Sequence, residues 1–489
     1  MTVFFRTLPT RIALASFLLL LFLSPAWVMA QQNVAPKGFT ALFNGENLAG
    51  WYGWSTRDPA DLWAMDSDQR AKYIRESIHG GLVDKKGNPT DDHVLAHWKV
   101  ADGELVNDGH GLYLTTEKDY GDFELHLEYK ALPKGDSGVY LRGTPQVQIW
   151  DSTEGDPRGL GQDKGSGGLW NNKGKLGKDP LKKMDKPFGE WNSLKITMIG
   201  ERVTVVMNGE VVVDNAPLEN FFANQKSGYV AYVAPGADKK KGTTEKMPNG
   251  FMIDPVYAKG PIQLQTHGSE IRWRNVFVRE IGPDEANKVL ASRDANGFVE
   301  LNNGRNLSNW VGAIDSYEIV DGAIVCKKGK GGDLLTKDEY DDFVLRVEFK
   351  LPTAGNNGIA IRTPQGGHSS RDGMELQVID SDGYNAAHKA SPLKPYQYHG
   401  SLYNCVGAKH GFLRPVGQWN FQEIEVRGQK IKVTLNGTKI LDVDIDQFDR
   451  TQIENIPKGL DRRSGHIGFA GHSDPVAFRS FKVKKLSKE

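Results

Sequence analysis

Two stretches of the sequence, FELHLEYK at residues 123–130 and FVLRVEFK at residues 343–350, decide the fold. In both, apolar side chains occupy every second position, and charged or polar side chains fill most of the positions between them. Because successive side chains of a β-strand point to opposite faces, this alternation predicts a strand with one face on a hydrophobic core and the other largely polar. The sequence therefore predicts the same kind of strand twice.

The two stretches belong to a longer repeat. GFTALFNG at residues 38–45 returns as GFVELNNG at 297–304, and SGVYLR at 137–142 is matched by NGIAIR at 357–362. GEWN at 189–192 likewise returns as GQWN at 417–420. A repeat of this length indicates a duplicated domain rather than a solenoid unit. Residues shared by the copies then indicate fold, and residues that differ indicate where function has changed.

Hairpin signals support an all-β fold. Asn208-Gly209 and Asn436-Gly437 each separate two strand-like runs, and Asn-Gly readily adopts the positive φ angles of a type I′ turn. Helical periodicity is confined to residues 58–77 and 283–292. Two antiparallel β-sandwiches are therefore expected.

The register between the copies locates their boundaries and insertions. Residues 36–281 form the first predicted domain, 282–296 a linker and 297–486 the second domain. Changes in the offset between matched motifs place about 40 extra residues of the first copy near 55–97 and about 23 near 234–257. The second copy gains nine residues in the loop 365–374.

Composition and charge exclude several classes of function. Residues 1–30 carry two arginines, a short apolar run and small residues before position 31, the pattern of a cleaved secretory signal peptide. We therefore expect export to the periplasm or the extracellular space, with no stable membrane insertion after cleavage.

The mature chain would have a net charge of −2 and shows no basic stripe, so nucleic-acid binding is not expected. No oligomeric state is predicted. The two cysteines, Cys326 and Cys405, lie only in the second copy, so a bridge that defines the fold is not expected.

The order of motifs resembles a known family. Gly-Phe-x-x-Leu-Phe-Asn-Gly, Tyr-x-Asp-Phe-x-Leu, Ser/Asn-Gly-x-x-x-Arg, Glu-x-Gln-x-x-Asp and Trp-Asn follow one another as in the 3-keto-disaccharide hydrolase domain family. The resemblance covers nearly all of the predicted mature chain, once per copy. It implies a concanavalin-like jelly roll and cleavage of glycosides oxidised at C3 of the sugar.

The second copy carries the better match to the candidate catalytic motif. Alternation places Glu375 and Gln377 on one strand face, which makes Glu375 the best-placed carboxylate for a concave surface and Gln377 a substrate-binding candidate. A solvent-facing glutamate is the alternative. Asp380 could act as an acid or close a turn. Arg362 could hold a keto oxygen or form a structural ion pair.

His399 and Tyr403 lie in the motif His-Gly-Ser-Leu-Tyr. Imidazole titrates near neutral pH, so His399 could be a base, although a structural histidine is equally expected. Tyr403 could stack on a sugar or relay a proton. No cofactor is predicted, and a divalent metal is unsupported because no tight ligand spacing is present.

The first copy departs from this motif. Gln146 stands where the second copy has Glu375, and an amide cannot act as a carboxylate base. Arg142, Gln148 and Trp170 could still bind a sugar by hydrogen bonding and stacking. A binding copy and an inactive structural copy are both open.

The family resemblance implies an elimination. A C3 carbonyl acidifies the C2 hydrogen, a base removes it, the aglycone leaves from C1, and water then adds. Glu375 or His399 could be the base, Arg362 or Tyr403 the enolate stabiliser, and Asp380 or the remaining base candidate the acid. Two alternatives stay open: a direct glycosidase using Glu375 and Asp380, and a non-catalytic, lectin-like carbohydrate-binding protein.

Overall fold

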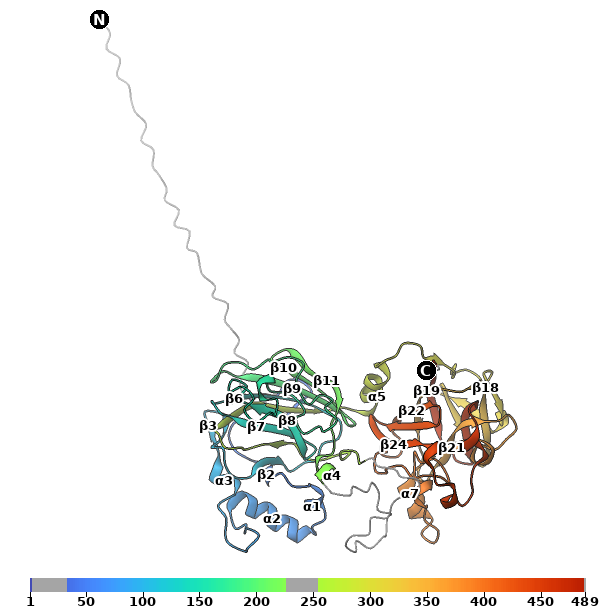
Figure 1. The fold of residues 1–489 in the computed structure, drawn as a ribbon, viewed down its shortest axis with the longest axis horizontal. Coiled ribbons are helices and arrows are strands. Elements are labelled where there is room, and N and C mark those ends of the chain that lie inside the picture. The colour runs from blue at the N-terminus through green and yellow to red at the C-terminus, as the bar shows by residue number, and fades with distance from the viewer. Residues whose placement is uncertain (2–32, 226–253, 488–489) are drawn as a thin grey trace.

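The computed structural model describes the chain except residues 2–32, 226–253 and 488–489, and it consists of two β-sandwiches joined by one helix (Figure 1). The predicted signal peptide and most of the predicted insertion at 234–257 lie outside the described residues. No helix in the described part of the chain is long and apolar enough to cross a membrane.

The first sandwich consists of an eight-stranded and a five-stranded sheet. The larger sheet has the order β11 (Glu210–Pro217), β10 (Arg202–Met207), β9 (Asn192–Ile199), β6 (Phe123–Ala131), β13 (Ile271–Glu280), β4 (Glu104–Asn107) and β3 (Trp98–Ala101), with β1 (Thr40–Ala41) also paired to β13. The smaller sheet has the order β2 (Trp51–Trp54), β5 (Tyr113–Thr116), β12 (Gln263–Leu264), β7 (Asp136–Leu141) and β8 (Thr144–Trp150).

The second sandwich repeats this topology strand for strand. Its eight-stranded sheet runs β24 (Thr438–Asp444), β23 (Lys430–Leu435), β22 (Trp419–Arg427), β19 (Phe343–Lys350), β26 (Ala477–Lys485), β17 (Ala323–Cys326) and β16 (Tyr317–Val320), with β14 (Val299–Glu300) on β26. Its five-stranded sheet runs β15 (Trp310–Gly312), β18 (Gly331–Tyr340), β25 (Gly465–His472), β20 (Asn356–Thr363) and β21 (Met374–Ile379). The predicted all-β fold of two tandem concanavalin-like jelly-roll sandwiches is confirmed.

The alternating stretches lie at the centre of each larger sheet, as β6 and β19. Their apolar residues are buried in two separate cores, one per sandwich: Phe123, Leu125, Leu127 and Tyr129 in the first, and Phe343, Leu345, Val347 and Phe349 in the second. The predicted Asn-Gly hairpins are also present, with φ angles of 50° and 89° at Asn208 and Gly209, and of 50° and 83° at Asn436 and Gly437. Local sequence thus dictates both the core strands and the turns.

Helices lie outside the sheets. α1 (Ala60–Trp63), α2 (Ser67–His79) and α3 (Val94–His97) occupy the predicted insertion near 55–97, and α1 and α2 pack on the side of β2 that faces away from the first core (Figure 1). α6 (Ser369–Asp372) lies in the predicted loop insertion, while α4 (Phe221–Gln225) and α7 (Ser381–Ala387) are short. α5 (Pro283–Ser292) is the predicted connector helix. Cys326 and Cys405 are buried and form no disulfide.

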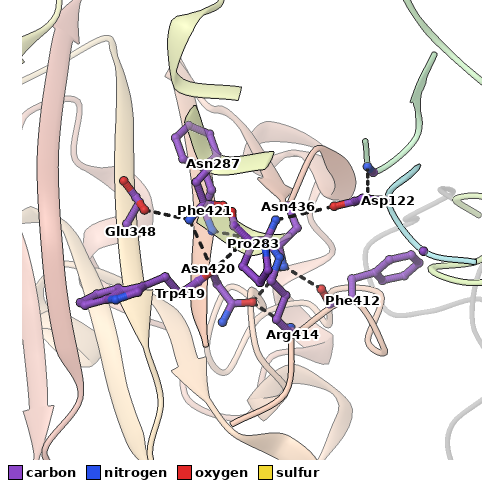
Figure 2. A network of polar contacts seen from close by, with 12 residues as sticks. Asp122, Pro283, Asn287, Glu348, Phe412, Arg414, Trp419, Asn420, Phe421 and Asn436 are labelled. Atoms are coloured by element: carbon purple, nitrogen blue, oxygen red, sulfur yellow. Dashed lines mark hydrogen bonds and ion pairs between the residues drawn. The ribbon is translucent and has the colours of Figure 1, made fainter. Parts of the chain in front are cut away.

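The two sandwiches meet at a polar junction beside α5 (Figure 2). Arg414 of the second domain donates to Oδ1 of Asn287 on α5 at 2.5 Å, and its guanidinium lies 3.7 Å from the carboxylate of Asp122 in the first domain. Asp122 also accepts from the backbone N–H of Gly200 at 2.9 Å. The backbone N–H of Glu201 donates to the carbonyl of Gly437 at 3.3 Å. Charged and backbone groups therefore link the domains directly.

Candidate active site

The candidate site of the second domain begins on β21, at the edge of the five-stranded sheet. Leu376 and Val378 point into the core, so Glu375 and Gln377 lie on the opposite face, here called the outer face. Glu375 is only 2% exposed, and its buried Oε1 atom makes no hydrogen bond of good geometry within the described residues. A buried carboxylate is costly unless a cation lies near it.

Small residues surround Glu375 on the neighbouring strand. Gly358 of β20 lies directly opposite Gln377, and a Cβ atom at this position would collide with the Glu375 carboxylate. Ala360 lies opposite Glu375 itself. The carboxylate therefore lies across the strand over a position that only glycine can fill.

His472, at the end of β25, pairs with Glu375. Its Nε2 atom lies 3.5 Å from Oε1 of Glu375, and its side chain is 40% exposed. The Glu375 carboxylate raises the pKa of His472 above its ordinary value, and Asp333 and Asp474 act in the same direction while burial opposes them. The imidazolium form is therefore favoured next to a buried carboxylate.

Three further polar residues adjoin this pair. Nε2 of Gln377 donates to Oδ1 of Asn356 at 2.6 Å, and the backbone N–H of Asn356 donates to Asp474 at 3.0 Å. Oε1 of Gln377 makes no hydrogen bond within the described residues. The amide oxygen of Gln377 could thus accept from a sugar hydroxyl.

Tyr403 joins Glu375 through the backbone. Its N–H donates to the carbonyl of Glu375 at 2.9 Å, and Leu402 bridges to Leu376 with its side chain in the core. The backbone of Tyr403 therefore lies beside that of Glu375, at the start of the turn 403–405.

His399 is not part of this group. Gly400, with φ at 78°, and Ser401 both hydrogen-bond across to Gln377, so the strand bulges here and the side chain before the bulge turns inward. His399 is 3% exposed, its ring centroid lies 5.0 Å from that of Phe349, and its Nε2 atom lies 2.9 Å from Oε1 of Gln422. Burial lowers the pKa of His399 to about 4. A neutral imidazole inside the core is badly placed to reach a sugar, so the expectation of a catalytic base is corrected here.

Arg362 is also turned away from the outer face. Its φ angle is 49°, at a register shift between β20 and β25, and its side chain is fully buried. The guanidinium donates to the carbonyls of Gly428 at 2.5 Å and Arg462 at 3.0 Å, and it lies 3.8 Å from Asp342. Within the described residues its hydrogen bonds join loops of the sandwich, and none of them goes to Glu375. The structural alternative for Arg362 fits this geometry, and the role of holding a keto oxygen does not.

Asp380 closes a turn. Its carboxylate accepts from the N–H of Gly383 at 3.2 Å, which caps α7, and from the N–H of Ala354 at 2.9 Å. Its carboxylate is thus already engaged by two backbone donors. It belongs with the turn and not with the polar residues around Glu375.

The first domain has the same framework with other residues on it. Nε2 of Gln146 donates to Oε1 of Gln148, and Nε2 of Gln148 donates to Asp136 at 2.8 Å, which in turn pairs with His267 at 3.1 Å. His267 and His472 occupy matched positions, because β12 pairs with β5 as β25 pairs with β18. The histidine is therefore repeated in both domains, but the first domain has the amide Gln146 at the position of Glu375.

Two tyrosines fill the outer face of the first domain. Tyr113 and Tyr140 stand at the positions of Asp333 and Ala360, and both hydroxyls lie within hydrogen-bond distance of Oγ1 of Thr56, at 2.9 and 2.8 Å. Their ring centroids are 5.4 Å apart. This packing leaves the first domain less room over its central strands than the alanine and aspartate of the second.

The remaining first-domain candidates are Arg142, Gln148 and Trp170. Arg142 has φ at 54°, is 1% exposed and donates to the carbonyl of Gly121 and to Asp122, as Arg362 does in its own loops. Trp170 is half-buried, and its Nε1 donates to the carbonyl of Leu160 at 3.2 Å. Gln148 is 3% exposed.

Sequence reasoning missed His472. A signal existed, since the offset of 205 between Gly260 and Gly465 also aligns His267 with His472. Because a titratable residue is repeated there in both copies, His472 could have been chosen as a candidate site residue. Among the described residues, no group of three or more histidines, cysteines, aspartates or glutamates is arranged to hold a metal ion.

Comparison with known proteins agrees with the repeat. The model of the 3-keto-alpha-glucoside-1,2-lyase-like domain matches residues 38–279 and again residues 297–484. A 3-keto-disaccharide hydrolase from Bacteroides thetaiotaomicron is 25% identical over 250 residues, which span 43% of this chain and 86% of that protein.

Solved structures with similarity to this chain include carbohydrate-active proteins. A candidate glycosyl hydrolase from Parabacteroides distasonis is 27% identical, covers 39% of this chain and all of its own, and has a TM-score of 0.34. A second one from the same organism is 22% identical, with a TM-score of 0.35 and coverage of 40% and 95%. A carbohydrate-binding module from Bacillus subtilis is 12% identical, with a TM-score of 0.24 and coverage of 39% and 92%.

Proposed function

The chain belongs to the family of 3-keto-alpha-glucoside-1,2-lyase-like domains, and from this premise we propose that it cleaves glycosides whose sugar carries a carbonyl at C3. It is a carbohydrate-active, hydrolase-like protein by family. The proposal adds the route, elimination followed by hydration, and assigns the chemistry to the second domain.

The observation that carries the proposal is the pair formed by Glu375 and His472. Glu375 provides a buried carboxylate, and His472, whose Nε2 atom lies 3.5 Å from Oε1 of Glu375, provides an imidazole whose pKa that carboxylate raises. An elimination needs both a base and an acid within one site. The first domain repeats the histidine but has Gln146 in place of Glu375, and its His267 pairs instead with Asp136 of the neighbouring strand.

In the proposed reaction, Glu375 removes the C2 proton that the neighbouring carbonyl acidifies. The C–H electron pair forms the C2–C3 double bond of an enolate, and the negative charge moves to the C3 oxygen. The enolate then reforms the carbonyl and expels the aglycone oxygen from C1, which takes a proton from imidazolium His472. Water adds to the resulting C1–C2 double bond, with its hydroxyl at C1 and a proton at C2. The net change is hydrolysis of the glycosidic bond.

Two neighbours can assist. The backbone of Tyr403 is hydrogen-bonded to that of Glu375, and its phenol could donate to the enolate oxygen, which would stabilise developing charge. The free Oε1 of Gln377 could accept from a sugar hydroxyl and hold the ring in register. Neither role requires Arg362 or His399.

The test compares substrates that differ only in oxidation. Purified full-length protein is incubated in D₂O with 3-keto and ordinary forms of the same aryl glucoside. We expect aglycone release only from the 3-keto form, with deuterium at C2 of the released sugar. Release from the ordinary glucoside at an equal rate would favour a direct glycosidase instead. No release from either, with retention on glycan columns, would favour a lectin-like protein.

We also propose that the protein is exported. The support is the amino-terminal pattern of residues 1–30. Expression of the full chain in a bacterium, followed by amino-terminal sequencing of the periplasmic and secreted fractions, should give a mature start at Gln31. Intact chain confined to the cytoplasm would contradict export.

A further inference from the structure

A pocket in the first domain lies where β8 ends. Its volume is about 410 Å³, within the usual range of small-molecule sites. Its walls combine aromatic rings with polar side chains: Tyr129, Trp150, Phe188, Lys183, Asp185 and Asn192. The pocket is separate from the candidate active site, which lies in the other domain.

The second domain shows what the same place looks like without this pocket. Matched hydrogen bonds fix the alignment, because the N–H of Lys186 donates to Asn192 and that of Arg414 donates to Asn420, both at 2.9 Å. By this register, Ser381 and Leu413 correspond to Ser152 and Asp185. They line a cavity of only about 100 Å³.

The difference in volume has a local cause. In the second domain the imidazole of His399 packs against Phe349 with ring centroids 5.0 Å apart. In the first domain the corresponding residues are Ser166 and Tyr129. The smaller serine leaves space beside the Tyr129 ring.

Two charged side chains of the pocket can bind a ligand. Lys183 donates one ammonium proton to the carbonyl of Ser152 at 2.6 Å, which leaves two donors within the described residues. Asp185 accepts from the N–H of Ser166, at 3.0 and 3.3 Å to its two oxygens, and both oxygens keep acceptor capacity. The Tyr129 ring lines the pocket, but its hydroxyl is itself buried beside Ser166 and is not open to the cavity.

Aromatic residues supply the apolar part. Phe188 is 38% exposed, and the second domain has Val416 at the matched position. Trp150 forms an edge-to-face contact with Trp170, with ring centroids 6.1 Å apart, where the second domain has Ile379 in place of Trp150. Each replacement in the first copy adds a ring or a polar group relative to the second. Ring faces with hydroxyl-directed donors and acceptors suit a ligand that has C–H faces and several hydroxyls.

We infer that the first domain binds one neutral sugar residue in this pocket, between Phe188 and Trp150, with its hydroxyls on Asp185 and Lys183. The lining has a formal charge of +1, from Lys183, Lys186 and Asp185, and Nζ of Lys186 already donates to the carbonyl of Trp191 at 2.9 Å, so Lys183 and Asp185 remain as a matched donor and acceptor for hydroxyl groups. The inference does not rest on the catalytic proposal. The first domain would then hold a glycan while the second domain acts on it.

The test uses the full-length protein and sugars that lack a C3 carbonyl: maltose and the methyl α-glycosides of glucose, galactose and mannose. Saturation-transfer NMR identifies the sugars that bind, and calorimetric titration gives their Kd. We expect at least one of the four to bind. Phe188→Val, which copies the second domain and alters an exposed side chain, should weaken it about five- to tenfold.

Controls separate this pocket from the active site. Val416→Ala, at the matched position of the second domain, and Glu375→Gln should both bind as the wild type does. Binding lost in Glu375→Gln and retained in Phe188→Val would place the sugar in the second domain and overturn the inference. Absence of binding by all four sugars would overturn it as well.

Discussion

Replacement of Glu375 by glutamine should abolish turnover of a 3-keto glycoside while the second domain stays folded. The side chain is 2% exposed, and glutamine has nearly the same shape. The first domain already accommodates Gln146 at the matched strand position, where it is 4% exposed. The exchange therefore removes a charge and a base without opening a cavity.

The two expected magnitudes differ widely. A positioned general base contributes about 10²- to 10⁴-fold to a rate, or about 3–5 kcal/mol in the barrier. The ion pair lost is that with Nε2 of His472, 3.5 Å away, and the histidine is 40% exposed. With water-like screening, that separation corresponds to about 1 kcal/mol. Activity should thus fall at least 100-fold while the melting temperature falls by only about 2–4 °C.

The assay is aglycone release from a 3-keto aryl glucoside, with thermal melts followed by circular dichroism. Glu339→Gln serves as control, because Glu339 lies on β18 of the same sheet with a half-exposed side chain. Glu339→Gln should change neither the turnover rate nor the melting temperature appreciably. Turnover by Glu375→Gln within threefold of the wild type would refute the assignment of Glu375 as the base. A large drop in melting temperature would instead show that the carboxylate is structural.

Three further outcomes are expected. The Glu375 carboxylate raises the pKa of His472, so a reaction rate that needs imidazolium should fall as the pH rises through that raised value, and the stabilisation from the ion pair should be lost over the same range. His472→Gln should remove this alkaline limb from the pH–rate profile. An unchanged limb would exclude His472 as the acid. Burial lowers the pKa of His399 from 6.5 to about 4, so the neutral imidazole stabilises the fold at pH above 6.5, and this contribution is lost as the pH falls toward 4. The melting temperature of His399→Gln should therefore fall less between pH 6.5 and 4 than that of the wild type. An equal fall would count against this account. Asp122→Asn breaks contacts with Arg414 across the junction as well as within its own domain, and should lower the free energy of unfolding in urea by about 3 kcal/mol. Asp342→Asn, which breaks contacts in one domain only, should lower it by less. Equal losses would show that the junction does not contribute.

Sequence alternation predicted the strands because burial on one face is a local property. FELHLEYK and FVLRVEFK became β6 and β19, and Glu375 lies on the outer face because β21 keeps a strict two-residue period between Met374 and Ile379. The repeat predicted that the two copies share one topology, as they do, but the order and pairing of the strands were not predicted from the sequence. Where the period holds, the position of a side chain can be read from its number.

The same rule explains the two misplaced candidates. Arg362 and His399 both stand at breaks in the period: Arg362 itself has φ at 49°, and Gly400 after His399 has φ at 78°. Each break turns the side chain from the outer face toward the interior. The bulge at Gly400 could have been predicted, because a glycine inside a strand pattern often marks a bulge. Nothing in the sequence around Arg362 predicts its positive φ angle. The first copy repeats both breaks at Arg142 and Gly167.

The differences between the copies therefore fall into two groups with different meanings. At bulges and turns the copies agree in geometry, so Arg142 and Arg362 are retained as internal braces. On the outer face they disagree at several positions together: Gln146 removes the carboxylate, and Tyr113 and Tyr140 fill the space above it with hydrogen bonds to Thr56. Loss of a base alone would leave an empty site. Because the space is also packed, the first outer face is built as a stable surface, and the aromatic pocket at Trp150 is the part of that domain still shaped for a sugar.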